Sequence, residues 1–254
     1  MLSKISVITV VYNAVQTIEN TILSVLHQTY PNIEYIVIDG ASTDGTVDVI
    51  KKYSDRLTWF SEPDKGLYDA MNKGIQKATG DWINFLNSGD EFFSKSTLSD
   101  IFETCHLDGD ILYGDIVAKY GHNKYRNVST KPLEYFCKGM PFCHQSAFVK
   151  AHILKNRNFD LSYRVFADYD MFYEFYYKKC YRFQKLPGFH AVYSVGGVSG
   201  ITAPIEEMKR INGQNISKWL FFKNRLGRKL PLKVFFFLCQ LKHIGRIYTI
   251  DKEQ

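Results

Sequence analysis

The first 39 residues of this 254-residue chain contain the pattern that restricts its fold most strongly. Ile5–Val11 is a run of mostly β-branched residues, which is typical of a strand buried in a parallel sheet. Ile18, Ile22 and Val25 then recur at helical spacing, and a second apolar run occupies residues 34–39. A strand, a helix and a strand within about 35 residues predict a right-handed βαβ unit. We therefore expect a single α/β domain with a mostly parallel central sheet and flanking helices.

Residues 82–91 (WINFLNSGDE) place a polar turn directly after a short apolar run. Ligands of α/β sheets bind at the carboxyl ends of strands, so Asn87, Asp90 and Glu91 would lie at a binding edge. Their oxygen atoms suit Mg²⁺ or Mn²⁺, and these ions suit phosphate groups. The alternative is an ordinary acidic turn, because Ser-Gly-Asp is common turn chemistry.

Asp39 ends the apolar run 34–39 and is followed by small residues. A carboxylate in this position can accept hydrogen bonds from a base or a ribose. The alternative is a turn that leads into a helix near Thr46. The segment contains neither a Gly-x-Gly-x-x-Gly motif nor a P-loop, which argues against dinucleotide and ATP binding.

The charge of the chain is concentrated toward its C-terminal end. The net charge is +6, and residues 205–254 hold 11 Lys/Arg against four Asp/Glu, so the rest of the chain is nearly neutral. Trp and Phe clusters alternate with these basic residues, which favours amphipathic helices on an anionic membrane surface over a nucleic acid partner. The longest apolar run, 234–239, is far too short to span a bilayer. The alternative is a helical pair that packs on the domain with a solvated basic face.

The five cysteines are odd in number and scattered, and residues 1–4 are too short for a signal peptide. Both features favour free thiols in a reducing cytosol. We divide the chain into a catalytic domain, residues 1–204, and a basic, aromatic, membrane-associating segment, residues 205–254.

Four sequence blocks resemble the inverting glycosyltransferases of family 2, in particular the bacterial O-antigen and lipopolysaccharide type. The blocks are ISVITVVYN (5–13), VIDGASTDGT (37–46), EPDKGLYDAMNKG (62–74) and WINFLNSGDE (82–91). A fifth block, ADYDM, follows at 167–171. Their joint order and spacing make the resemblance specific. It implies the single-domain GT-A fold, which binds a nucleotide-sugar through a divalent metal.

The resemblance also implies a role for each matching position in the first three blocks. Asp39 would bind the base, most often uracil. The positions that would line the nucleotide and the sugar are Thr9, Tyr12, Asp39, Lys65, Asp69 and Asn72.

The fourth block departs from the family pattern, which usually reads D-x-D-D. Here Asn87 and Gly89 stand where carboxylates are usual, and only the last acid, Asp90, is kept. The resemblance therefore makes Asp90 the metal ligand, for Mn²⁺ or Mg²⁺, and leaves Asn87 to bind a ribose hydroxyl. The departure predicts weaker metal binding in the absence of the donor and leaves metal independence open.

The fifth block resembles the E-D-x-D-L segment of the family, whose second acid is the catalytic base. That position is Asp168, with Asp170 as a supporting group, while Ala167 replaces the usual Glu. The alternative is that both carboxylates favour a helix N-terminus through the helix dipole.

Two further positions are candidates for substrate contact. His144 follows Cys143 in residues 142–149, which we expect to form a strand, and it would contact the sugar or the acceptor. Local hydrogen bonding is the alternative. Ser199 ends a Gly-Gly-Val-Ser stretch that would close over the diphosphate, with His190 as a second donor, whereas a plain glycine turn is the alternative.

Together these expectations predict an inverting hexosyltransferase that uses a UDP-sugar, with glucose or galactose as the best candidates. The acceptor would be a sugar on undecaprenyl diphosphate, such as GlcNAc-diphosphate-undecaprenol, and the product a β-glycoside of a surface polysaccharide. The protein would act as a peripheral enzyme at the cytoplasmic face of the bacterial inner membrane, without nucleic acid. The alternatives are a non-catalytic membrane-bound relative and a sugar nucleotidyltransferase.

Overall fold

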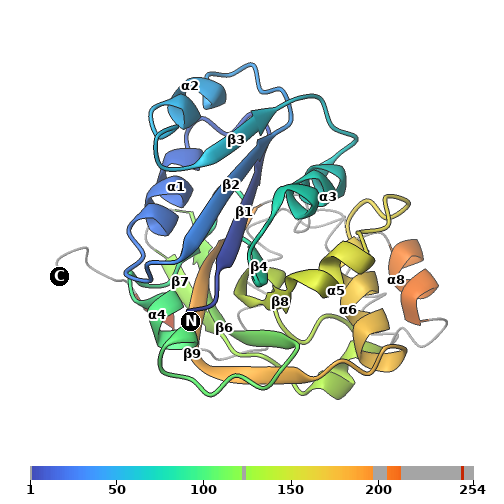
Figure 1. Cartoon of the computed structure of the whole chain (residues 1–254). Helices are drawn as coiled ribbons and strands as arrows, with labels where there is room; N and C mark the ends of the chain where they lie inside the picture. Colours follow the sequence, from blue (N-terminus) through green and yellow to red (C-terminus); the bar gives the residue numbers. More distant parts are fainter. Residues whose placement is uncertain (1, 122–123, 197–204, 213–246, 249–254) are drawn as a thin grey trace.

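A computed structural model describes residues 2–121, 124–196, 205–212 and 247–248 of the chain (Figure 1). Most of the basic C-terminal segment, including its predicted amphipathic helices, therefore lies outside the described residues. Within the part that is described, no helix is both long enough and apolar enough to cross a membrane.

The amino-terminal half of the sheet is parallel, as the βαβ pattern predicts. Its strands lie in the order β3-β2-β1-β4, and each neighbouring pair is parallel. Val11 at the end of β1 lies opposite Asp39 at the end of β2. The carboxyl ends therefore meet at one edge of the sheet. The strands are β1 (Ile5–Val11), β2 (Ile33–Asp39), β3 (Thr58–Ser61) and β4 (Trp82–Phe85).

The other half of the sheet is mixed, which corrects the expectation of a mostly parallel sheet. β6 and β7 form a hairpin, β8 pairs antiparallel with both β4 and β6, and β9 runs parallel to β6. The short hairpin connection allows only antiparallel pairing, because a parallel pair needs a long crossover. The strands are β5 (Glu91–Phe92), β6 (Ile111–Tyr120), β7 (Lys124–Val128), β8 (Phe148–Lys150), β9 (Phe183–Ser194) and β10 (Ile247–Tyr248).

Helices cover both faces of the sheet, so the α/β fold class is confirmed (Figure 1). Successive side chains of a strand point to opposite faces, and β1 shows this clearly. Ile8 packs into the hydrophobic cluster beneath α3, whereas Ile5 and Val7 pack into the cluster beneath α1 and α2. The helices are α1 (Ile18–Leu26), α2 (Thr46–Lys51), α3 (Leu67–Lys77), α4 (Thr97–Phe102), α5 (Ala151–Asn156), α6 (Ala167–Tyr177) and α8 (Ile205–Asn212).

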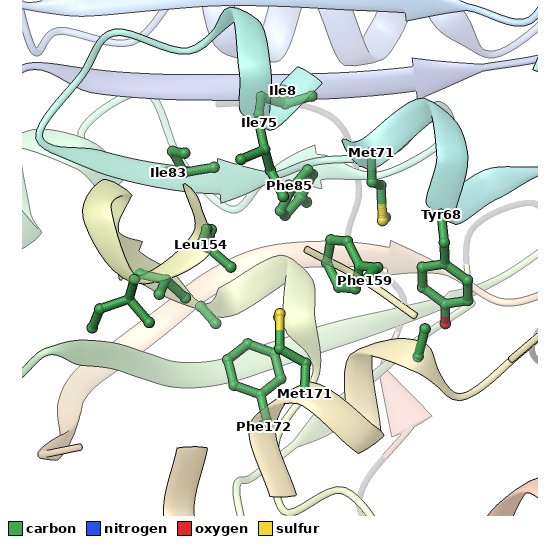
Figure 2. Close-up of a cluster of buried hydrophobic side chains, with 14 of the residues drawn as sticks. Ile8, Tyr68, Met71, Ile75, Ile83, Phe85, Leu154, Phe159, Met171 and Phe172 are labelled. Carbon is green, nitrogen blue, oxygen red and sulfur yellow. The ribbon is translucent and has the colours of Figure 1, made fainter. Parts of the chain in front are cut away.

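The cluster beneath α3 joins the sheet to α6, the helix that carries the fifth sequence block. Figure 2 shows side chains of β1, β4, α3, α5 and α6 meeting there. Phe159 lies at its centre, with ring centroids 5.3 Å from Tyr68 and 5.4 Å from Phe85. Apolar burial of this kind contributes roughly 1.5–3 kcal/mol for each large side chain. The packing therefore holds α6 in a defined position relative to the carboxyl edge of the parallel strands.

Residues 142–149 contain a 3₁₀ helix rather than a continuous strand. The structure forms η2 (His144–Ser146) first and begins β8 only at Phe148. A buried amide explains the difference, because the Asn84 side chain in β4 donates to the carbonyl oxygens of Gln145 and Ala147, 3.0 and 2.8 Å away. These two bonds hold the backbone in a turn that the local apolar pattern does not reveal.

Candidate active site

Asp39 is a buried carboxylate at the end of β2 with one oxygen left for a ligand. Its Oδ2 accepts hydrogen bonds from the Ser42 amide at 3.0 Å and the Ser61 hydroxyl at 2.6 Å. Its Oδ1 is buried and has no partner among the residues that the structure describes. Buried polar atoms are nearly always hydrogen-bonded, so this oxygen suits a donor from a bound molecule.

Tyr12 presents an exposed ring beside the loop that follows Asp39. The Tyr12 side chain is 65% exposed, although it directly follows β1. A Cβ on Gly40 would overlap the Asp64 carboxylate and would lie 3.3 Å from the Tyr12 ring. Glycine therefore allows the loop after β2 to approach both side chains. An exposed aromatic ring of this kind can stack on a planar base.

Thr9 lies in the core rather than at this surface. It is fully buried, and its hydroxyl donates to the Leu86 carbonyl at 2.7 Å and lies 3.0 Å from the Tyr35 hydroxyl. It thus joins β1 to the end of β4 and supports the polar turn that follows. The structure gives Thr9 no surface with which to line a pocket, because both faces of the sheet are covered.

The next three predicted residues lie in α3 and in the loop directly before it. Lys65 is exposed, and its amide donates to the Asp69 carboxylate at 3.0 Å. The Asn72 side chain donates to the Phe159 carbonyl at 2.9 Å and accepts from the Phe159 amide at 2.8 Å. Asp69 therefore shapes the loop before α3, and Asn72 clamps α3 to the segment before α6.

Asp90 is buried at the turn between β4 and β5. Its side chain is 5% exposed, its Oδ1 accepts from the Ser194 amide and its Oδ2 from the Gln145 side chain, both at 3.0 Å. Burial raises the pKa of Asp90 to about 6, although these hydrogen bonds act in the opposite direction. Gly89 makes the turn possible, because its φ of +97° favours glycine.

The residues around Asp90 fit a cation that is shared with phosphate groups, but they do not form a complete cage. No group of three or more His, Cys, Asp or Glu side chains within the described ranges could hold a metal ion. Each carboxylate oxygen has a second lone pair, so Asp90 can still act as a ligand. Mg²⁺ commonly takes one or two carboxylates and completes its shell with water and substrate phosphates.

Asp168 lies in the first turn of α6 within a chain of hydrogen bonds. Its Oδ1 accepts from the Tyr68 hydroxyl at 3.0 Å, and its Oδ2 lies 3.1 Å from Nδ1 of His144. Nε2 of His144 lies 3.3 Å from Nδ2, the side-chain amide nitrogen, of Asn87. The His144 and Asp168 side chains are 17% and 16% exposed. The structure thus brings three predicted residues together with Tyr68, which the helical pattern identifies only as a core residue.

Asp170 and Ala167 have different surroundings from Asp168. Asp170 forms an ion pair with Arg157 at 2.6 Å, so it supports the junction between α5 and α6. Ala167 is fully buried and offers only a methyl group where the family usually has Glu. Asp170 also lies in the first turn of α6, where a carboxylate interacts favourably with the helix dipole.

Glu207 and His190 support the backbone around the site. The Glu207 carboxylate of α8 accepts from three consecutive backbone amides, those of residues 164–166, at 2.8–3.0 Å. It orders the segment directly before Asp168, and no local sequence pattern points to it. His190 is buried against the carbonyl oxygens of Ser146 and Pro187, so it supports the backbone instead of facing a ligand. Ser199 lies outside the described residues.

Comparisons with known proteins identify the family of the chain. The profile described as "Glycosyl transferase family 2" matches residues 6–183. A PGL/p-HBAD biosynthesis glycosyltransferase of Mycobacterium bovis is 32% identical over 154 residues, which cover 58% of this chain and 59% of the relative. The putative teichuronic acid biosynthesis glycosyltransferase TuaG of Bacillus subtilis is 40% identical over 92 residues, 35% of this chain and 36% of the relative.

Solved structures share the fold. Residues 1–349 of TarS from S. aureus, in complex with UDP-GlcNAc, match with a TM-score of 0.63 and 21% identity, over 82% of this chain and 64% of that chain. The mannosyltransferase PcManGT of Pyrobaculum calidifontis, in complex with GDP-Man and Mn²⁺, matches with a TM-score of 0.61 and 19% identity, over 79% and 59%. The aligned part spans about three fifths of the first curated relatives.

Proposed function

The chain belongs to glycosyltransferase family 2, and on this premise we propose that it transfers a hexose from a UDP-sugar to a lipid-linked acceptor with inversion. Glucose and galactose are the proposed sugars, and GlcNAc-diphosphate-undecaprenol is the proposed acceptor. The product would be a β-linkage in an O-antigen or a similar surface polysaccharide. The observation that carries the proposal is the hydrogen-bonded group that joins Asn87 at the strand edge to Asp168 at the start of α6.

In this reaction Asp168 acts as the general base. The acceptor hydroxyl attacks the anomeric carbon, and the Asp168 carboxylate takes its proton as the bond to the diphosphate breaks. Oδ1 of this carboxylate accepts from the Tyr68 hydroxyl and the Tyr169 amide, and Oδ2 faces Nδ1 of His144, so a lone pair of Oδ2 is left for the acceptor. A positioned base contributes a factor of roughly 10²–10⁴ to the rate.

The nucleoside would bind beside β2. The unpartnered Oδ1 of Asp39 can accept the imino N–H of uracil, and the exposed ring of Tyr12 can stack on the base. Lys65 is exposed at the start of α3, where its ammonium group can reach a phosphate. The UDP-GlcNAc bound by TarS, whose fold is similar, supports a UDP-sugar as the donor class.

Asp90 would hold Mn²⁺ or Mg²⁺ together with the diphosphate of the donor. When bound, such an ion neutralises the negative charge that develops on the leaving diphosphate. The chain's own contribution is to bury the Asp90 carboxylate and to fix both of its oxygens through Gln145 and Ser194. Because the described residues contain no group of three or more metal-ligating side chains, we propose that the metal binds weakly until the donor supplies phosphate oxygens.

The lipid acceptor places the enzyme at the cytoplasmic face of the inner membrane as a peripheral protein. Residues 213–246 carry most of the basic and aromatic residues of the C-terminal end, and this composition suits an anionic membrane surface. Deletion of residues 213–254 should abolish binding to anionic vesicles. This deletion keeps α8 and Glu207, whereas a cut at residue 205 would also remove the bonds that order residues 164–166. Unchanged vesicle binding would contradict the membrane role.

A donor screen tests the transferase activity directly. The full chain is incubated with radiolabelled UDP-glucose, UDP-galactose and other nucleotide-sugars, Mn²⁺ and a lipid-diphosphate GlcNAc acceptor. Label should move to the lipid fraction with one UDP-hexose, and linkage analysis should show a β-glycoside. No transfer from any donor would overturn the proposal.

Two neighbouring substitutions test the assignment of the base. Asp168→Asn should lower kcat about 10²–10⁴-fold while UDP still binds. Asp170→Asn is the matched control, and it should affect stability more than rate because Asp170 pairs with Arg157. Full activity in Asp168→Asn would exclude Asp168 as the base.

A non-catalytic membrane-bound relative is the second candidate, favoured by Asn87, Gly89 and Ala167 at positions where the family usually has acids. Such a protein would bind UDP without any transfer. A sugar nucleotidyltransferase has less support, because residues 12–15 (YNAV) after β1 contain no basic residue for a triphosphate.

A further inference from the structure

The 3₁₀ helix η2 connects the two acids of the site. His144 on this turn contacts Asp168, and the next residue, Gln145, contacts Asp90. The turn itself is anchored in the core by Asn84 of β4, which donates to the carbonyl oxygen of Gln145 and to that of Ala147 directly after the turn. A ring nitrogen of His190 lies 3.1 Å from a third carbonyl oxygen, that of Ser146. A buried turn held from both sides has few ways to move, so it can fix the side chains that project from it.

The hydrogen bonds of His144 define its tautomer. Nδ1 faces the Asp168 carboxylate, which can only accept, so the proton of a neutral ring must be on Nδ1. Nε2 then carries a lone pair and must receive a donor. The atom placed 3.3 Å from it is the amide nitrogen of Asn87, which is a donor.

This tautomer also determines the orientation of the Asn87 amide. With its NH₂ group directed at Nε2 of His144, the carbonyl Oδ1 points elsewhere. Oδ1 of Asn87 is buried and has no partner among the residues that the structure describes. If the amide were rotated, its oxygen would face the Nε2 lone pair and the two acceptors would repel. The contact of His144 Nδ1 with Asp168 therefore determines, through the imidazole ring, that Oδ1 of Asn87 is the acceptor left free at the strand edge.

We propose that His144 is a positioning residue that acts on both sides of the reaction. Its Nδ1–H orients the Asp168 carboxylate, and its Nε2 holds Asn87 so that Oδ1 is free for a hydroxyl group of the donor. The proposal rests on the proposed function for the identity of base and donor. It replaces the expectation that His144 itself contacts the sugar or the acceptor.

The tautomer can be measured without any substrate. Nitrogen-15 NMR of the histidine rings in the full chain at about pH 8 should show His144 protonated on Nδ1 and unprotonated on Nε2. The His144→Phe variant assigns the signals, since it removes only this ring. In Asp168→Ala the preference for Nδ1–H should be lost. A wild-type ring protonated on Nε2, or a spectrum that Asp168→Ala leaves unchanged, would overturn the proposal.

Two substitutions at the same position separate positioning from general stability. His144→Phe keeps an aromatic ring and removes both nitrogens. Loss of a hydrogen bond to a charged group should lower kcat about tenfold or more, and the donor KM should rise. His144→Asn can place an amide nitrogen near the position of Nδ1 but is too short to reach Asn87. It should recover much of kcat and leave the donor KM raised.

A purely structural role predicts a different result, in which both variants lose stability and kcat together and no rescue by Asn occurs. Thermal unfolding of each variant provides that comparison. Absence of transfer in the wild-type chain would defeat the proposed function alone, because the NMR measurement still decides whether His144 holds Asp168 and Asn87.

Discussion

The clamp between Asn72 and Phe159 allows a quantitative test of how α6 is positioned. Asn72→Ala removes two hydrogen bonds, one of 2.9 Å to the carbonyl of Phe159 and one of 2.8 Å from its amide. Each such bond contributes roughly 0.5–1.5 kcal/mol, so the free energy of unfolding should fall by about 2 kcal/mol. The ring of Phe159 lies between Tyr68 and Phe85 in Figure 2, and the segment it anchors leads to α6.

Urea unfolding followed by circular dichroism measures this change. The midpoint should decrease while the slope m stays constant, because the surface exposed on unfolding is unchanged. For a domain of this size the melting temperature should fall by about 4–8 °C. UDP binding measured well below the melting temperature should be retained, since both functional groups of the Asn72 amide are engaged with the backbone.

Gln76→Ala is the matched control on the same helix. Its side chain makes one long, exposed hydrogen bond of 3.4 Å to Asn158, and surface changes of this kind stay within about 0.5 kcal/mol. An Asn72→Ala variant as stable as this control, but unable to bind UDP, would refute the reasoning. That result would indicate that Asn72 binds the nucleotide-sugar directly.

Two further predictions concern the frame around the site. Burial acts to raise the pKa of Glu34, but hydrogen bonds from groups including Lys4 and Ser6 outweigh it and lower the pKa from 4.5 to about 2. The ionised Glu34 carboxylate therefore stabilises the fold above pH 4.5, and this stabilisation is lost as the pH falls toward 2. Glu34→Gln should lower the free energy of unfolding by about 1–2 kcal/mol at pH 7, after allowance for screening, and by almost nothing near pH 2. Thermal unfolding at the two pH values measures the difference. Gly114→Ala should cost about 1–3 kcal/mol, because its Cβ would overlap the buried His190 ring, and a melting temperature equal to wild type would contradict this.

Local patterns predicted the elements that depend on local chemistry. The β-branched run of β1, the helical spacing of α1 and the apolar runs that end at Asp39 and Leu86 are short-range patterns, and the structure has the corresponding elements. The family resemblance rests on the same segments, and the profile match over residues 6–183 confirms it. Donor, acceptor and metal stay predictions, because side chains alone do not select a sugar or a lipid.

Local sequence patterns did not predict which side chains in and directly after β1 are buried and which are exposed. Thr9 and Tyr12 belong to the same block, yet one is fully buried and the other is 65% exposed. In a sheet covered on both faces the polar Thr9 is accommodated by the carbonyl of Leu86, which is distant in sequence. The expectation of a mostly parallel sheet failed for a related reason, since pairing of β8 with β4 and β6 depends on the tertiary arrangement.

The sequence by itself determined the βαβ half of this protein, its family and the identity of its acids, because these depend on residue type and short-range spacing. Only the tertiary structure decided which groups work together. Asp168 is separated by 24 residues from His144 and by 100 from Tyr68, yet both bind its carboxylate. The reason is physical: a hydrogen bond requires two atoms about 3 Å apart, and packing of α6 and η2 against the sheet brings them there.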